Sequence, residues 1–391
     1  MILKNFWDYR YLGRIDFRMA LVIFALMMAG LLVIASHTVE KVDHNTAIGI
    51  SSSLGEPFFT PMVIQQIERL LAGVVIFCFF VGFDYNRLRE WTWILYILVL
   101  FALIGVFFTN SIQGVHRWYR IPLLGISIQP SEYAKLTVVM ALSWFLEKSQ
   151  GKSGSLSTAC FASLILAIPF FLILRQPDLG TALIVASIAL VIFYFGGVHP
   201  YVIRLMSISG ALALLLIALI FLGAIPHESI RPWATKVLKE YQFDRLDPNT
   251  HHQKAAVTAI ALGGVTGKGW RNGDYTQGGW LPTPYTDSVF SAFGEEFGLI
   301  GLIVLLLLFY ALIYFSFQVC AVAPNLFGRF LAAGIAAFIA AHLIVNVGMM
   351  TGLLPITGVP LVLITYGGSS VLLTMAALGI LQSIYSRRFM F

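Results

Sequence analysis

The side chain best placed for acid–base chemistry is Asp287, which stands where a long polar segment meets an apolar run. Partial burial beside Val289 and Phe290 would disfavour the charged carboxylate and raise the pKa of Asp287, which suits a general base. The structural alternative is a helix N-cap, because an aspartate just before an apolar helix often accepts backbone N–H bonds. On residue type alone, the N-cap is the commoner role.

A second group of polar residues surrounds the start of the fourth apolar run. Arg117 and Trp118 precede this run, and Glu132 and Lys135 lie in its first turns at i, i+3 spacing on one helix face. Charges at membrane depth are costly and mark functional sites. Arg117 offers a planar donor fork and Lys135 a point charge, so the group could bind a phosphate or pyrophosphate. The alternative is a capped helix with an internal ion pair and Trp118 as an interfacial anchor.

Three further segments carry polar or irregular sequence. Asp178 is predicted to cap a helix, and Arg175 to neutralise it or the end of the preceding helix. Glu295 and Glu296 fall one to two turns inside an apolar run, so they are expected to pair with loop cations or line a polar cavity. From 346 to 370, dense glycine and proline predict irregular backbone, which at membrane depth must be buried in protein or line a cavity.

The glycine-rich run from Gly263 to Gly269 invites comparison with a phosphate-binding P-loop. Leu262 stands where the first glycine of that motif should be, and Gly269 stands where Ser or Thr should hold magnesium. The comparison therefore fails.

Composition sets the class of protein that must position these residues. Of the 391 residues, 58% are hydrophobic and 11% are charged, whereas soluble domains carry about 25% charged residues. This excludes a soluble enzyme.

The net charge of +6 comes from scattered Lys and Arg and not from a basic stripe, so no nucleic acid partner is expected. The three cysteines lie in apolar runs without ligand spacing, so neither disulfides nor a zinc site is predicted.

The apolar runs predict an all-α polytopic membrane protein with ten transmembrane helices, since spanning segments must satisfy their own backbone. The runs lie at about 18–37, 64–83, 91–109, 131–147, 157–174, 179–197, 203–224, 289–316, 329–350 and 366–385. They form a single domain over 1–391. The segment 225–288 is far longer than an ordinary connection, so we expect one large, functional extracytoplasmic loop there.

Basic residues in the short connections predict the orientation. With a cytoplasmic N-terminus, twelve lie inside: Lys4, Arg10, Arg14, Arg18, Arg87, Arg89, Lys148, Lys152, Arg204, Arg329, Arg387 and Arg388. Four lie outside: Lys41, Arg117, Arg120 and Arg175. This asymmetry places both termini in the cytoplasm.

The motifs, in this order and in a ten-span chain, resemble the SEDS family of shape, elongation, division and sporulation proteins. The resemblance covers nearly the whole chain. It rests on Arg117-Trp118 with Gln129-Pro-Ser-Glu-Tyr-Ala-Lys135, Gln176-Pro-Asp-Leu-Gly-Thr181, Gly263-Gly with Gly267-Lys-Gly269, Leu281-Pro with Thr286-Asp287 and Glu295-Glu-Phe-Gly298, and Gly352-Leu-Leu-Pro355 through Tyr366-Gly-Gly-Ser-Ser370. Gly358-Val-Pro360 looks more like the elongation (RodA-like) branch than the division branch.

The resemblance implies a peptidoglycan glycosyltransferase of the bacterial cytoplasmic (inner) membrane. Such an enzyme polymerises the lipid-linked precursor lipid II on the outer face, for cell elongation and rod shape. The implied partners are a class B penicillin-binding protein, which crosslinks the strand, and other membrane proteins of the elongation complex. By position, Asp287 matches the essential family aspartate, and Arg117, Glu132 and Lys135 match functional polar residues near the central cavity. Tyr285 stands where the family commonly has histidine, so a histidine relay at that place is not assumed.

These residue types suit glycosyl transfer. We expect Asp287 to take the proton of the acceptor 4-hydroxyl. Arg117 and Lys135 would stabilise the charge of the donor pyrophosphate, and a divalent cation (Mg or Mn) is a further candidate for sharing that charge. Glu132 would orient Lys135 or an incoming sugar, and Trp118 is predicted to belong to the same substrate-binding group. A lipid II flippase would use the same polar residues. However, a transporter needs charges along a path between both faces, and here they cluster on the outer side.

Overall fold

All ten predicted apolar runs are helices in the computed structural model, which describes residues 7–37, 58–109, 116–121, 126–235 and 240–389. The ten are α1 (Phe17–His37), α2 (Pro61–Gly82), α3 (Leu88–Gly105), α4 (Pro130–Lys148), α5 (Leu156–Arg175), α6 (Leu179–Phe195), α7 (Pro200–Phe221), α12 (Val289–Val322), α13 (Leu326–Met350) and α14 (Gly368–Ser386). Among the described residues, eight spans are long and apolar enough to cross a membrane. The other two are α6, which has 17 residues, and α4, which carries charges.

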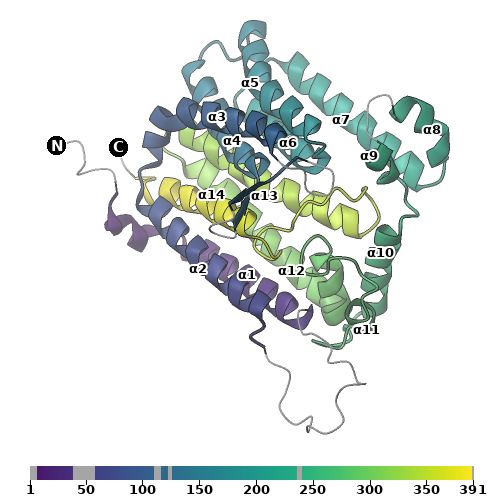
Figure 1. Ribbon diagram of the computed structural model, residues 1–391. Coiled ribbons are helices and arrows are strands. Elements are labelled where there is room, and N and C mark those ends of the chain that lie inside the picture. The colour runs from purple at the N-terminus through teal and green to yellow at the C-terminus, as the bar shows by residue number, and fades with distance from the viewer. Residues whose placement is uncertain (1–6, 38–57, 110–115, 122–125, 236–239, 390–391) are drawn as a thin grey trace.

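The helices α13 and α14 form the centre of the bundle (Figure 1). In that view they lie between the pair α1 and α2 and the group α3 to α6, and α13 packs against α12, α6 and α4. Close packing uses small residues, as is usual between membrane helices. A Cβ added to Gly379 on α14 would lie 2.7 Å from the backbone oxygen of Phe77 on α2. These buried helices are therefore the elements able to hold a precise polar site.

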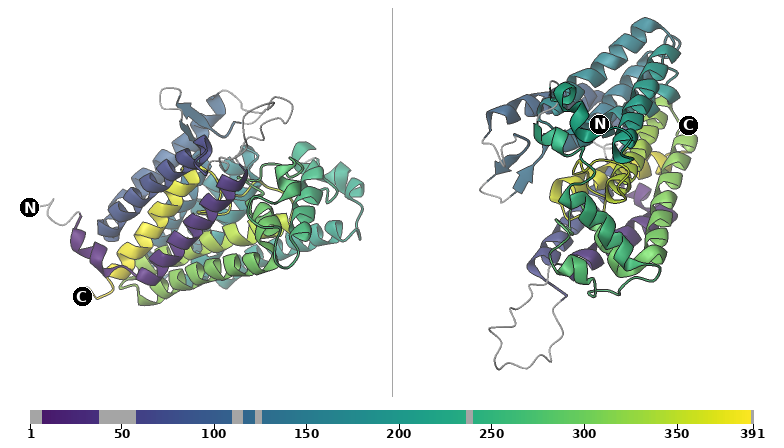
Figure 2. Two further views of the ribbon diagram at one scale, coloured as in Figure 1. Left: turned by 90° about the horizontal axis from the view of Figure 1, so that it is seen from below. Right: turned by 90° about the vertical axis from the view of Figure 1, so that its right-hand side faces the viewer.

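Both ends of the described chain lie at one end of the long helices (Figure 2, left). The backbone N–H of Asp16 donates to Gln382 (2.8 Å), and the Arg387 guanidinium lies 3.9 Å over the Tyr11 ring. Arg89 pairs with Glu147 at the same end of the bundle (2.7 Å). Arg89 and Arg387, two of the basic residues counted as inner, therefore lie at the end of the bundle that carries both chain ends. Lys4 and Lys41, which the topology prediction also counts, lie outside the described residues.

The described part of the segment 225–288 (225–235 and 240–288) is folded, and it lies at the opposite end of the bundle (Figure 2). It contains α8 (His227–Ala234), α9 (Glu240–Asp244), α10 (His251–Gly263) and α11 (Asp274–Gln277).

The connection before α4 contains a feature that the sequence analysis missed. It is an antiparallel hairpin of β1 (Tyr119–Ile121) and β2 (Ile126–Ile128), in which Tyr119 pairs with Ile128.

The glycine-rich run after α10 packs backbone to backbone against a kink in α12. The kink is at Gly298, which has φ 65° and ψ −165°. The N–H groups of Lys268 and Gly269 donate to the carbonyls of Glu295 and Glu296 (3.0 and 2.9 Å), and that of Leu299 donates to Gly264 (2.9 Å). The glycines therefore permit close backbone approach and do not form a phosphate loop.

We predict that Gly298→Ala destabilises the protein. Its φ and ψ lie in a region that is essentially restricted to glycine, and its Cβ would lie 2.6 Å from the carbonyl oxygen of Val265. We expect a loss of about 1–3 kcal/mol from the backbone alone, measured as a lower thermal unfolding midpoint in detergent. Gly210→Ala on α7, where nothing lies within 4 Å, is the matched control. Equal midpoints for the two variants would contradict this account.

Candidate active site

A cavity of about 840 Å³ lies among α2, α4, α6, the segment before α12 and the connection between α13 and α14. Four of the five predicted site residues line it: Arg117, Trp118, Glu132 and Asp287. The fifth, Lys135, lies behind the cavity wall. Tertiary packing therefore joins residues that are up to 170 positions apart in the sequence.

Asp287 presents its carboxylate to this cavity and does not cap α12. The N-cap residue of α12 is Ser288, and it makes no side-chain capping bond. The backbone carbonyl of Asp287 accepts a bond from the Asn346 amide (3.1 Å), which also donates to the carbonyl of Val359 (2.7 Å). No hydrogen bond reaches the carboxylate from any described residue. Opposite it is Gly358, where an added Cβ would lie 3.4 Å from Oδ2. The N-cap alternative is wrong, and the carboxylate is available for other chemistry.

The surroundings of Asp287 favour its neutral form. Burial raises the pKa of Asp287 above that of a free aspartate, and the charge of Arg245 opposes this effect. The nearby His252 imidazole lies 2.8 Å from the Ser288 hydroxyl, and burial, followed by the charges of Arg245 and His251, lowers the pKa of His252. A carboxylate with a raised pKa is a stronger base once it is deprotonated.

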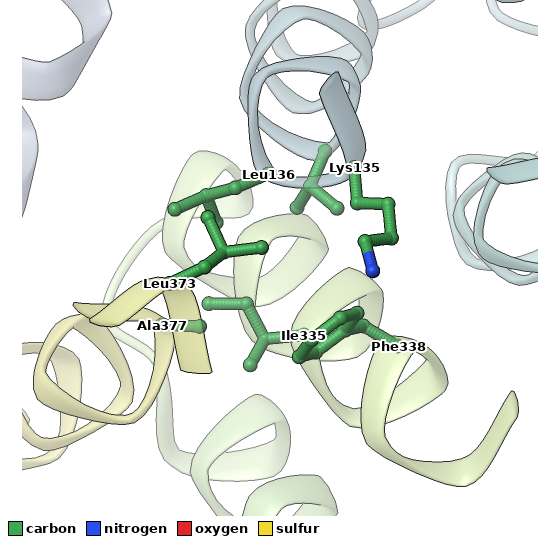
Figure 3. A pocket seen from close by; sticks show the side chains of 7 residues that line it. Lys135, Leu136, Ile335, Phe338, Leu373 and Ala377 are labelled. Atoms are coloured by element: carbon green, nitrogen blue, oxygen red, sulfur yellow. The ribbon is translucent and has the colours of Figure 1, made fainter. Parts of the chain in front are cut away.

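Glu132 and Lys135 form the buried ion pair that their spacing predicts. Lys135 Nζ lies 2.7 Å from Glu132 Oε1 and 2.9 Å from His342 Nε2. His342 Nδ1 lies 2.9 Å from the Pro360 carbonyl oxygen, which can only accept, so Nε2 must accept from the lysine. Figure 3 shows the Lys135 side chain between α4 and α13, with Phe338 beside it. The ammonium group is thus shared by two protein partners, whereas Glu132 Oε2 is buried without one.

Two of the guanidinium nitrogens of Arg117 donate hydrogen bonds to the protein itself. Its Nε donates to the Gln176 carbonyl (2.8 Å), and Nη2 donates to the carbonyl of Pro177. Arg117 therefore takes the role at the end of α5 that the sequence suggested for Arg175, which is exposed. Asp178 caps α6 as predicted, because its Oδ1 accepts from the backbone of Thr181 (3.2 Å).

Glu295 and Glu296 attach the large loop to α12 and do not line the main cavity. Glu295 accepts from the backbone N–H groups of Tyr275 and Thr276 (2.8 and 2.9 Å). Glu296 accepts from the Arg271 backbone (3.1 Å) and from the hydroxyl of Ser36. Both carboxylates therefore satisfy backbone N–H groups of the loop, and Glu296 also links the loop to α1 through Ser36.

Sequence reasoning missed several cavity and support residues, among them Arg69 and Tyr366 in the lining and His342 behind it. Arg69 lies within a span, and a charge at that depth was the signal that could have found it. His342 could not be assigned without knowing which helix faces α4.

The divalent cation stays a prediction, because Mg²⁺ at a pyrophosphate needs only one or two protein carboxylates. No group of three or more His, Cys, Asp or Glu side chains comes together as a metal site in the described part of the chain. The cavity carboxylate of Asp178 is already occupied by donors from Gln129, Ser131 and Thr181.

The fold and cavity define a multi-pass helical membrane protein whose cavity, at the end opposite both termini, is lined by acidic and basic side chains. A model of the cell cycle protein family, which groups FtsW, RodA and SpoVE, matches residues 16–388. The chain therefore belongs to this family, and the resemblance to SEDS proteins is confirmed.

Individual relatives are similar over most of their length. Peptidoglycan glycosyltransferase MrdB of Escherichia coli K12 is 30% identical over 386 residues, which is 98% of this chain and 96% of that protein. Stage V sporulation protein E of Bacillus subtilis is 30% identical and covers 95% and 98%. FtsW of Trichlorobacter lovleyi is 32% identical and covers 82% of each chain. Because these identities are so close, the choice of the elongation branch stays a prediction.

Solved structures have the same fold. RodA of Thermus thermophilus superposes with a TM-score of 0.69 at 23% identity, covering 96% of this chain and 98% of that one. A chain of a peptidoglycan synthase complex gives 0.74 at 24% identity, covering 96% and 99%.

We predict that breaking the buried ion pair from one side destabilises the protein more than removing it completely. Glu132→Leu leaves the Lys135 ammonium buried without a carboxylate, which typically costs about 3–5 kcal/mol. The double variant Glu132→Leu/Lys135→Met should recover much of this loss. Thermal unfolding followed by circular dichroism measures both. A double variant that is less stable than Glu132→Leu would show that the pair does not behave as one unit.

Proposed function

We propose that this protein is a peptidoglycan glycosyltransferase that polymerises lipid II at the outer face of the bacterial cytoplasmic membrane. MrdB, which aligns with 98% of the chain, carries this activity in its name, and the FtsW relative, which aligns with 82%, is named a probable peptidoglycan glycosyltransferase. One observation carries the proposal furthest: the Asp287 carboxylate faces a large cavity, and no hydrogen bond from any described residue reaches it. A base poised for a substrate hydroxyl needs this arrangement.

In the proposed reaction, Asp287 removes the proton from the 4-hydroxyl of the acceptor sugar. The hydroxyl oxygen then forms a bond to the anomeric carbon of the donor. The bond from that carbon to the pyrophosphate oxygen breaks, and its electron pair leaves on the lipid pyrophosphate. Because the leaving group is already a stabilised anion, no protonating acid is required, and one carboxylate suffices where glycosidases use two.

The other predicted residues receive distinct roles in this proposal. Arg117 would use its remaining N–H groups on the substrate while its Nε and Nη2 hold the turn after α5. Glu132 Oε2 would accept from a sugar hydroxyl or amide. Lys135 would act through Glu132 by fixing its orientation, and Trp118 would contact a sugar face at the cavity wall. No step is assigned to a metal ion.

The cellular setting follows from the same reasoning. We propose the inner membrane, with both termini cytoplasmic, because twelve of the sixteen basic residues counted in the short connections fall on the side of the two termini by the sequence assignment, and both chain ends lie at one end of the bundle (Figure 2). A class B penicillin-binding protein is the proposed crosslinking partner within the elongation complex. The chain of a synthase complex that coordinates polymerization and crosslinking has a similar fold. The flippase alternative is weaker, because the cavity lining comes from one end of the bundle.

We expect Asp287→Asn to lose polymerisation by about 10²–10⁴-fold, the usual effect of removing a positioned base. Its thermal stability should not fall, because the substitution removes a partly buried charge. Strand synthesis from purified lipid II, with and without the partner, measures the first effect. The isosteric change makes a folding defect easy to recognise. A folded Asp287→Asn protein that polymerises at the normal rate would remove Asp287 from this role.

We also predict an acidic limb in the pH profile. A base works only when deprotonated, and burial raises the Asp287 pKa, so the rate should fall about tenfold per pH unit below that raised pKa. Arg245 lowers the pKa of Asp287, so Arg245→Ala should shift the limb to higher pH. Initial polymerisation rates across the pH range measure this. A profile that stays in place in Arg245→Ala would contradict the assignment.

A further inference from the structure

The helix α2 brings a cation into the cavity that no sequence motif singles out. Arg69 is the ninth residue of α2, roughly 12 Å along the helix from its first residue at 1.5 Å per residue. It lines the cavity wall together with Glu68 and Tyr366. A charge at this depth is costly unless it is used.

Arg69 stacks on Tyr366, which is hydrogen-bonded to the segment that carries the proposed base. Its guanidinium carbon lies 4.3 Å from the centre of the Tyr366 ring. The Tyr366 hydroxyl donates to Gln65 on α2 (2.7 Å), and its backbone N–H donates to the Tyr285 carbonyl (2.9 Å). Tyr285 is two residues before Asp287, and its ring contacts Tyr366 edge to face. The cation and the base therefore stand on one connected piece of structure.

The charge of Arg69 is the least compensated among the predicted and observed cations of the site. No described carboxylate forms an ion pair with it, and it makes no hydrogen bond to a described residue; the ion pairs of the bundle involve other cations. By contrast, Arg117 donates to two backbone carbonyls, and Lys135 is shared by Glu132 and His342.

We propose that Arg69, held on Tyr366, binds the diphosphate of the lipid-linked donor, an inference that rests on the proposed glycosyl transfer. A guanidinium matches phosphate oxygens in a two-point contact, and stacking on an aromatic ring leaves its N–H edge open. When the bond from the anomeric carbon to oxygen breaks, the electron pair moves to the diphosphate, and the Arg69 charge stabilises it there. Arg69 thereby takes over the main role that the sequence suggested for Lys135.

The test separates binding from chemistry. A polyprenyl diphosphate in nanodiscs serves as the probe, and its affinity is measured in the Asp287→Asn protein with and without further changes. Losing a charge-assisted contact to phosphate should weaken binding about 10-fold to 100-fold in Arg69→Ala. Arg69→Lys should recover part of the affinity, since the charge remains but the two-point geometry is lost. Arg175→Ala, which removes an exposed arginine at the same end of the bundle, is the matched control and should bind normally.

Variants of Tyr366 test the inference independently. Tyr366→Phe keeps the ring and should bind nearly as the parent does, whereas Tyr366→Leu should weaken binding in the same direction as Arg69→Ala. Should Arg69→Ala fail to fold, Arg69→Lys and Tyr366→Leu make the same comparison. Unchanged affinity in folded Arg69→Ala, or an equal loss in Arg175→Ala, would overturn the inference. Activity retained in Asp287→Asn would instead overturn the proposed base and leave the binding result standing.

Discussion

A hydrocarbon environment supplies no hydrogen bonds, so every polar group at membrane depth must find its partner inside the protein. This constraint accounts for most of the polar contacts of the bundle. Lys135 is shared by Glu132 and His342, and Arg117 closes the turn after α5. Two charged groups differ from this pattern. The Asp287 carboxylate and the Arg69 guanidinium have no hydrogen-bond partner among the described residues, and both residues line the cavity. A charged group without a protein partner in a membrane protein is energetically costly, so we expect these two groups to contact a substrate.

The buried helix α13 supplies the rigid support for this site. His342 and Asn346 are one turn apart, so they lie on the same helix face. His342 lies against the Pro360 carbonyl, and Asn346 donates to Val359 and to the Asp287 backbone. One helix therefore fixes the distance between the Gly358 to Pro360 backbone and the carboxylate opposite it. Such pre-organisation is what acid–base chemistry requires of a scaffold.

Several features were predictable because they depend on local spacing. Long apolar runs had to be helices in lipid, the i, i+3 spacing of Glu132 and Lys135 brought them together, and Asp178 stood where an N-cap belongs. Asp287 was found as a candidate, but its role as a cap was wrong, since Ser288 occupies the N-cap position. Glu295 and Glu296 were recognised as unusual, yet their partners in the loop depend on how the chain returns to α12.

The sequence by itself therefore determined the membrane class, the ten helices and the candidate carboxylate, because hydrophobic length and near-neighbour spacing act within one segment. Only the tertiary structure decided which cations face the cavity. It turned Lys135 away from the open space toward His342 and brought Arg69 from α2 onto Tyr366, next to the segment of Asp287. The physical reason is that helix rotation and partner choice are set by packing among distant segments, which no local pattern encodes.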